Sequence, residues 1–257
     1  MNKPQEASVA QVSKPAPNDT NMTAPDDLIC PASSIFDAVQ TRSAIDAAIA
    51  TLTGPRDIRR ATVDILTAAQ KVGRDAIQAA FEAAPFDARP TTRAYSYLTD
   101  HLVGETLYVA TTYLHPLPNP TESERLSLIA VGGYGRGEMA PQSDVDLLFL
   151  TPYKITPWAE SMIESMLYIL WDLKLKVGHA SRTIKDCLRL ATDDYTIRTS
   201  LVEYRYLAGD AGLARDLGKK LWKDLFQSTA ADFIEAKLVE RAERHRKQGG
   251  QRYVVEP

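Results

Sequence analysis

Two acidic residues spaced two apart, Asp144 and Asp146, are the side chains of this sequence best suited to support catalysis. They lie in an apolar stretch that predicts a β-strand, where residues two apart leave the same face with Cα atoms about 6.5 Å apart. Carboxylates that close together repel each other and lose hydration, and a bound Mg²⁺ ion offsets both effects. The pair therefore predicts a Mg²⁺ site of the kind used in phosphoryl transfer. The alternative is that one or both acids cap a helix or a turn.

Four glycines lie within six residues just before these acids, at Gly132, Gly133, Gly135 and Gly137. Glycine allows positive φ angles and a close approach of the backbone to a ligand. The amides of such a loop form a cradle for phosphate oxygens. The spacing matches neither a Walker loop nor the dinucleotide fingerprint, since no Gly-Lys-Ser/Thr follows. Alone, the loop is equally consistent with an ordinary tight turn.

Short apolar runs on both sides of the glycine loop predict the strands that position these groups. They cover residues 126–131 and 144–150. In the second run the apolar residues alternate with the two acids and therefore point into a core. A third strand is predicted over 175–182. Together with the helices around them, these strands predict an α+β or α/β fold with a small mixed sheet flanked by helices.

Helical periodicity, prolines and capping residues predict helices before and after the strands. Thr156 is suited to cap one helix, with Pro157 at its first position. Thr183 and Asp186 have the spacing of a capping box at the start of another. The predicted helices cover residues 35–53, 55–84, 90–115, about 157–174, from 184 onward, about 193–207, 211–227 and 230–247.

The composition excludes several classes of protein. The 257 residues are 44% hydrophobic and 25% charged, which is typical of globular proteins. No apolar run approaches the ~20 residues that span a bilayer, and the start lacks the apolar stretch of a secretory signal. A net charge of −3 argues against nucleic acid as a partner. The two distant cysteines, Cys30 and Cys187, exclude a disulfide scaffold and fit a reducing cytoplasm.

The motifs around the acids resemble a known signature. Residues Ile129–Glu138 followed by Ser143–Leu148 resemble the polymerase-β-like nucleotidyltransferase superfamily, with an apolar strand, a Gly-Gly turn and Asp-x-Asp on the next strand. The particular residues of these two motifs are similar to those of the PII signal-protein uridylyltransferase/uridylyl-removing family of bacterial nitrogen regulation. Three later stretches extend the resemblance, at Leu170–His179, Ser181–Thr183 and Leu201–Asp210.

The resemblance implies a role for the acids and for the loop. Gly132 and Gly133 would hold the triphosphate of UTP, and Asp144 and Asp146 would bind Mg²⁺. The metal would polarise the α-phosphate and stabilise the departing pyrophosphate. The attacking group would be a tyrosine hydroxyl of the PII protein.

Three further residues are implied as phosphate contacts. Ser143 would donate to a phosphate oxygen, Arg136 would do the same or brace the loop, and Arg182 would reach a phosphate unless it is an ordinary surface arginine. The superfamily often uses a third carboxylate. The third predicted strand contains no carboxylate, so the two candidates are Asp172 and Glu203. The alternative for Asp172 is a solvated helix residue. The alternative for Glu203 is an ion-pair partner of an arginine at 198 or 205.

Composition, the predicted elements and the resemblance together divide the chain into four expected parts. Residues 1–33, which hold five of the fifteen prolines, are predicted to be a disordered tail. Residues 34–118 form an N-terminal helical region, 119–183 the nucleotidyltransferase core, and 184–257 a C-terminal helical region. The specific matches cover residues from about 126 to the end, whose last five residues, 253–257, have the character of a strand that stops abruptly.

Other charged and polar groups have plainer interpretations. His179 is expected to be structural, and the basic residues between 237 and 247 are expected to form a solvated helix face or, alternatively, a docking face. The family also contains a phosphohydrolase part that needs adjacent His-Asp ligands. None of the four histidines here precedes an aspartate, so this chain is expected to lack that activity and to correspond to the N-terminal part of a larger enzyme.

Two alternatives stay open. The same chemistry could act on another acceptor, such as glutamine synthetase, a tRNA end or a small molecule, with ATP as the donor. The chain could also be a non-catalytic regulatory fragment that keeps the fold. The preference for UTP rests on the resemblance alone.

Overall fold

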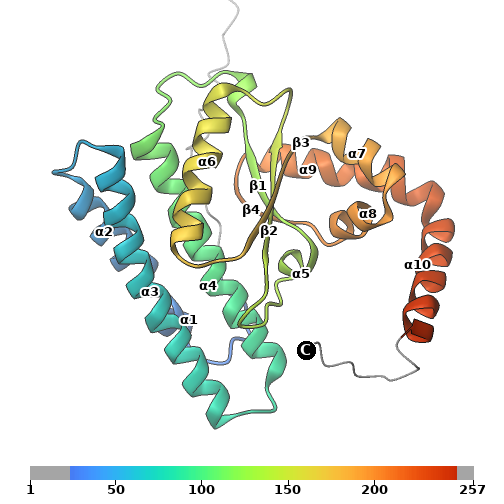
Figure 1. The fold of residues 1–257 in the computed structure, drawn as a ribbon, viewed down its shortest axis with the longest axis horizontal. Coiled ribbons are helices and arrows are strands. Elements are labelled where there is room, and N and C mark those ends of the chain that lie inside the picture. Colours follow the sequence, from blue (N-terminus) through green and yellow to red (C-terminus); the bar gives the residue numbers. More distant parts are fainter. Residues whose placement is uncertain (1–23, 248–257) are drawn as a thin grey trace, which may run out of the picture.

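A four-stranded sheet lies at the centre of the computed structural model, which describes residues 24–247 (Figure 1). The strand order is β3-β2-β1-β4. Strand β1 is antiparallel to both β2 and β4, and β2 is parallel to β3. This confirms the small mixed sheet. The strands are β1 (Ser127–Ala130), β2 (Val145–Thr151), β3 (Val177–Thr183) and β4 (Arg205–Gly209).

Helices flank the sheet on both sides, with α2, α3, α4 and α6 on one side and α7 to α10 on the other (Figure 1). The helices are α1 (Ala32–Ile35), α2 (Ala38–Ile49), α3 (Pro55–Ala83), α4 (Ala88–Val109), α5 (Gly132–Gly135), α6 (Pro157–Asp172), α7 (Ile184–Asp193), α8 (Tyr195–Val202), α9 (Ala211–Lys220) and α10 (Gln227–Lys247). Shorter turns are the π-helical Ala110–Leu114 and Leu221–Phe226 and the 3₁₀ turn Glu122–Glu124.

Successive side chains of β2 point to opposite faces of the sheet and contribute to two separate hydrophobic cores. Leu147 and Phe149 are buried against α4 and α6, whereas Leu148 and Leu150 are buried against α7 and α9. Burying each such side chain contributes about 1.5–3 kcal/mol, so a one-residue slip of the strand would be costly. Asp146 has the same phase as Leu148 and Leu150. It therefore leaves the face of the sheet on which α7, α8 and α9 pack.

The N-terminal segment differs from the prediction in two ways. The single helix expected from residue 35 is two helices, because Phe36 is extended and Asp37 accepts a hydrogen bond from the Gln40 N–H to start α2. The prediction of a disordered tail was wrong for residues 24–33. The side chains at 28–30 pack on the core, and Asp27 forms an ion pair with Arg93. Residues 1–23 lie outside the described residues.

The prediction of one helix over 193–207 was also wrong. Asp194 caps α8 by accepting from two backbone N–H groups, and this helix ends at Val202. Residues Arg205–Gly209 pair instead with β1, where their backbone groups find hydrogen-bond partners and Leu207 and Ala208 are buried. The partner strand is about 75 residues away in the sequence, so no local pattern shows it.

The remaining elements follow the local signals. Thr156 caps α6, and Thr183 and Asp186 form the predicted capping box of α7. Non-helical angles at Thr229 mark the expected break before residue 230. The terminal strand predicted at 253–257 lies outside the described residues. No helix between residues 24 and 247 combines the length and apolar character needed to cross a membrane.

Candidate active site

The two acidic residues lie at the start of β2. Asp144 is exposed and directly precedes the strand, and Asp146 is half-buried as its second residue. Burial raises the pKa of Asp146, and the negative charge of Asp144 raises it further. The two carboxylates are therefore close enough to repel each other, which is the arrangement that a divalent cation stabilises.

Two glycines make room for the Asp146 carboxylate. A Cβ atom placed on Gly132, which has a φ of +60°, would lie 3.3 Å from Asp146 Oδ2. A Cβ atom on Gly178, the neighbour of Asp146 on β3, would lie only 2.4 Å from Oδ1. The Val131 N–H donates to the Asp146 carbonyl at 3.1 Å, which ties the start of the glycine loop to β2. The carboxylate thus sits between the loop and the edge strand.

Gly178 is not among the site residues predicted from the sequence. The available signal was a glycine inside a predicted strand, which often marks the close approach of another group. Here the close group is the Asp146 carboxylate.

The glycine loop folds into the short helix α5 and packs tightly against the end of α8. A Cβ atom on Gly135 would lie 1.8 Å from the Glu203 carbonyl oxygen, so only glycine fits there. Arg205 holds the other side of the loop, because it donates to Asp100 at 2.7 and 3.0 Å and to the Tyr134 carbonyl at 3.2 Å. The loop is thereby fixed between α4, α8 and β4.

Arg136 and Glu203 form an ion pair beside the loop, with Nη1 donating to Oε2 at 2.5 Å. Half of the Arg136 side chain is exposed. The expected pairing of Glu203 with an arginine at 198 or 205 was wrong, since residue 205 is bound to Asp100. Arg136 therefore braces the loop in this structure, and its guanidinium stays 3.5 Å from the Cβ position of Gly133.

Ser143 and Arg182 are placed differently from each other. Ser143 closes a turn, with its Oγ accepting from the Ala140 N–H at 2.9 Å, one residue before the first acid. Arg182 shares the Asp146 face of the sheet but lies four residues beyond Gly178 on β3, about 13 Å along the strand. Ser143 is therefore engaged in a turn next to the first acid in the sequence, and Arg182 lies at a distance from Asp146.

Neither candidate third carboxylate joins the pair. Asp172 forms a 3.5 Å ion pair with Arg59 at the end of α6, on the opposite face of the sheet, and Glu203 is held by Arg136. Across residues 24–247 no group of three His, Cys, Asp or Glu side chains is arranged to hold a metal. His179, expected to be structural, is exposed on β3. The donor set is thus two carboxylates, which suits Mg²⁺ when it is also bound by water and substrate phosphates.

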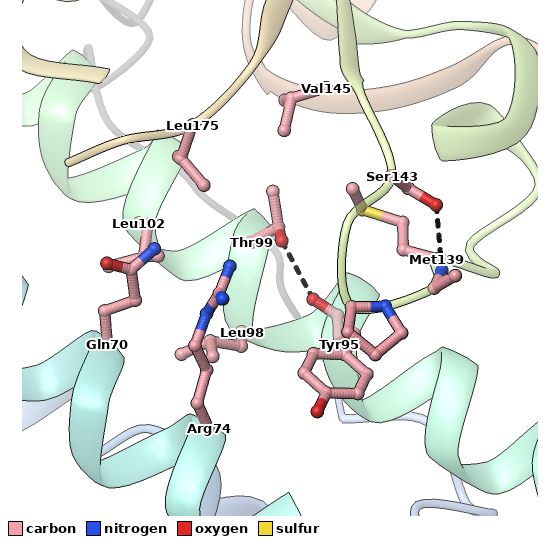
Figure 2. Close-up of a pocket in the computed structure, with 12 residues that line it drawn as sticks. Gln70, Arg74, Tyr95, Leu98, Thr99, Leu102, Met139, Ser143, Val145 and Leu175 are labelled. Atoms are coloured by element: carbon pink, nitrogen blue, oxygen red, sulfur yellow. Dashed lines mark hydrogen bonds between the residues drawn. The ribbon is translucent and has the colours of Figure 1, made fainter. Parts of the chain in front are cut away.

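A small cavity lies on the other side of this region, between α3, α4 and the loop before β2 (Figure 2). Gln70 and Arg74 of α3 face Tyr95 and Thr99 of α4 across it, and Val145 contributes to its wall. Val145 is out of phase with Asp146, so this cavity is separate from the carboxylates.

Comparison with known families agrees with this geometry. Residues 120–204 match the family model of the nucleotidyltransferase domain. The chain therefore contains a nucleotidyltransferase domain. This nucleotidyltransferase domain includes the glycine loop, both acids and strands β1 to β3, and its matched region ends just after α8.

The chain is also similar to individual curated proteins. It is 59% identical over 90% of its length to a bifunctional uridylyltransferase/uridylyl-removing enzyme of Cereibacter sphaeroides. Proteins with the same name from Ruegeria pomeroyi and Phenylobacterium zucineum are 59% and 48% identical over 87% of the chain. These matches confirm the family resemblance found in the sequence. The chain spans about a quarter of the length of these relatives (25%, 24% and 24%).

Proposed function

We propose that the chain transfers UMP from UTP to a tyrosine of the PII regulatory protein in a Mg²⁺-dependent reaction that releases pyrophosphate. The observation that carries the proposal is the Asp146 carboxylate, held between Gly132 of the loop and Gly178 of β3 with Asp144 beside it. The choice of UTP and PII is supported by the family resemblance and by the name of the relatives.

The two carboxylates would hold Mg²⁺, which supplies positive charge to the phosphates when it is bound. The chain itself orients the nucleotide. The backbone N–H groups at Gly132 and Gly133 are suited to bind the triphosphate, because glycine has no side chain of its own to keep a phosphate away from the backbone. The brace formed by Arg205 and Asp100 keeps this loop in place, which favours a fixed reactive geometry.

Three predicted phosphate contacts have unequal support. Arg136 would have to exchange its carboxylate partner, Glu203, for a phosphate oxygen. Ser143 would have to give up the hydrogen bond that it accepts from the Ala140 N–H. Arg182 fits a contact with a distant part of the nucleotide or of the acceptor better than a contact at the metal.

The test is transfer of label from [α-³²P]UTP to purified PII in the presence of Mg²⁺. We expect labelling by the wild-type chain and a loss of at least 100-fold in Asp144→Asn and Asp146→Asn, with Asp172→Asn as the matched control that retains activity. Labelling with ATP in preference to UTP would favour the alternative acceptors. An absence of both transfer and UTP binding would overturn the proposal.

A further inference from the structure

The outer edge of β3 carries no strand partner among residues 24–247. Strand β3 is the terminal strand of the sheet, bonded to β2 on one side only. Two of its side chains, His179 and Ser181, are exposed. An unpaired strand edge is a template for another extended chain.

The backbone groups that face outward can be identified from the register. The Val145 N–H donates to the Lys176 carbonyl at 2.7 Å, and Val145 is aligned with Val177. In a parallel pair, successive residues turn their N–H and C=O groups alternately toward the neighbouring strand and away from it. The even-numbered residues of β3 therefore bond to β2, and the backbone groups of Val177, His179 and Ser181 point away from the sheet.

This edge lies directly beside the candidate catalytic acid. Asp146 leans across β3, since its Oδ1 occupies the space where a side chain of Gly178 would be. Neighbouring strands lie about 4.8 Å apart, so a strand added to β3 would run about 10 Å from β2. With only a glycine between them, a tyrosine side chain on that added strand can reach back toward the Asp146 carboxylate.

Apart from the two acids proposed to bind the metal, three basic residues lie on or next to β3, with Lys176 before it, Arg182 within it and Lys185 at the start of α7. Lys176, Arg182 and Lys185 carry no ion-pair partner in the part of the chain that the structure describes. The nearby Asp186 is engaged, because its carboxylate accepts from Thr183 to cap α7. An acidic partner therefore complements this edge better than a neutral or basic one.

We propose that the acceptor binds by β-strand addition, with an extended acidic segment that carries its tyrosine pairing along the outer edge of β3. The inference rests on the proposed function and adds how the acceptor is recognised. Backbone hydrogen bonds to His179 and Ser181 hold the segment in register, and the glycine at 178 lets the tyrosine hydroxyl approach the carboxylates.

The first test uses Ser181→Pro, which removes one outward N–H and leaves the bonds to β2 intact, since proline is tolerated on edge strands. The matched control is Ser181→Ala, which keeps the N–H. We expect the KM for PII to rise at least tenfold in Ser181→Pro only, with the KM for UTP unchanged. We also expect Lys185→Glu to raise the KM for PII at low ionic strength and less at high ionic strength.

The second test uses the wild-type chain, so it does not depend on a variant that folds. Amide hydrogen exchange is measured residue by residue with and without PII. The N–H groups of His179 and Ser181 should exchange rapidly in the free chain and become protected with PII present. An unchanged exchange rate, or an unchanged KM in Ser181→Pro, would overturn strand addition alone. A wild-type chain that labels no PII overturns the proposed function as well.

Discussion

The replacement Gly178→Ala tests whether the position of the Asp146 carboxylate matters. Gly178 lies within β3 and is not among the glycines with positive φ, so its backbone accepts alanine. The added Cβ atom, however, would lie 2.4 Å from Asp146 Oδ1. Because β2 and β3 are fixed by their ladder, the carboxylate is the group that must move.

The size of the effect follows from this distance. Ordinary contact begins at 3.4 Å, so the carboxylate oxygen must shift by about 1 Å from its position at 2.4 Å. A misplacement of ~1 Å at a reacting centre can lower the rate about 100-fold, equivalent to about 2.7 kcal/mol of transition-state stabilisation. Stability should change little, because alanine in a strand is favoured over glycine by about 0.5–1 kcal/mol, which offsets part of the strain.

The assay is the rate of UMP transfer together with thermal unfolding of the same sample. His179→Ala is the matched control, because it alters the adjacent exposed residue on the other face of β3. We expect a loss of about 100-fold in kcat/KM for Gly178→Ala and less than threefold for the control. Transfer within threefold of wild type by a folded Gly178→Ala chain would refute the role given to this geometry.

Other perturbations have defined outcomes. Gly135→Ala places a Cβ atom 1.8 Å from the Glu203 carbonyl, so we expect a loss of about 1–3 kcal/mol in the free energy of unfolding by urea; unchanged stability would show that α5 and α8 separate easily. Asp100→Asn weakens the bidentate bond to Arg205, and we expect UTP affinity measured by calorimetry to fall as the loop loosens, whereas equal affinity would contradict the bracing role. Burial lowers the pKa of His101 from 6.5 to about 4. As the pH falls below 6.5, His101 takes up a proton in the unfolded chain before it does so in the folded chain. The contribution of the neutral His101 to the free energy of unfolding is therefore largest above pH 6.5 and should fall by about 3 kcal/mol as the pH drops to about 4. His101→Phe should remove most of that dependence in unfolding curves, and an unaltered pH profile would contradict it.

Much of the fold is predictable because interactions between residues close in the sequence determine where its strands and helices begin and end. The apolar residues of β2 alternate with the acids and are buried as expected, so the strand was found within one residue of its ends. The caps at Thr156 and Thr183 act through neighbours within three residues. Signals of this kind do not depend on the tertiary structure.

The errors arise where distant residues decide the structure. Strand β4 forms because β1 offers it hydrogen bonds, and nothing within residues 205–209 distinguishes this strand from the end of a helix. The ordered segment at residues 24–33 is held by α4 and the core, although its composition resembles a tail.

Only the centre of the candidate site could be assembled from the sequence, and its role stays a prediction. The acids and the glycine loop adjoin in sequence, so the strand–turn–strand geometry brings them together. The partners of Arg136 and Asp146 come from elsewhere in the chain, at Glu203 and Gly178, and spacing alone does not reveal them. Arg182 shares a face with Asp146, but the rise of β3 separates them.

The central claim is that Asp144 and Asp146 together hold a divalent ion bound to the phosphates of a nucleotide. Its most direct test is to count Mn²⁺, as a spectroscopic substitute for Mg²⁺, by electron paramagnetic resonance in titrations with UTP. We expect nucleotide-dependent binding of Mn²⁺ by the wild-type chain and its loss in the chain with both Asp→Asn replacements. Equal Mn²⁺ binding by the two chains, or none by the wild type with UTP present, would contradict it.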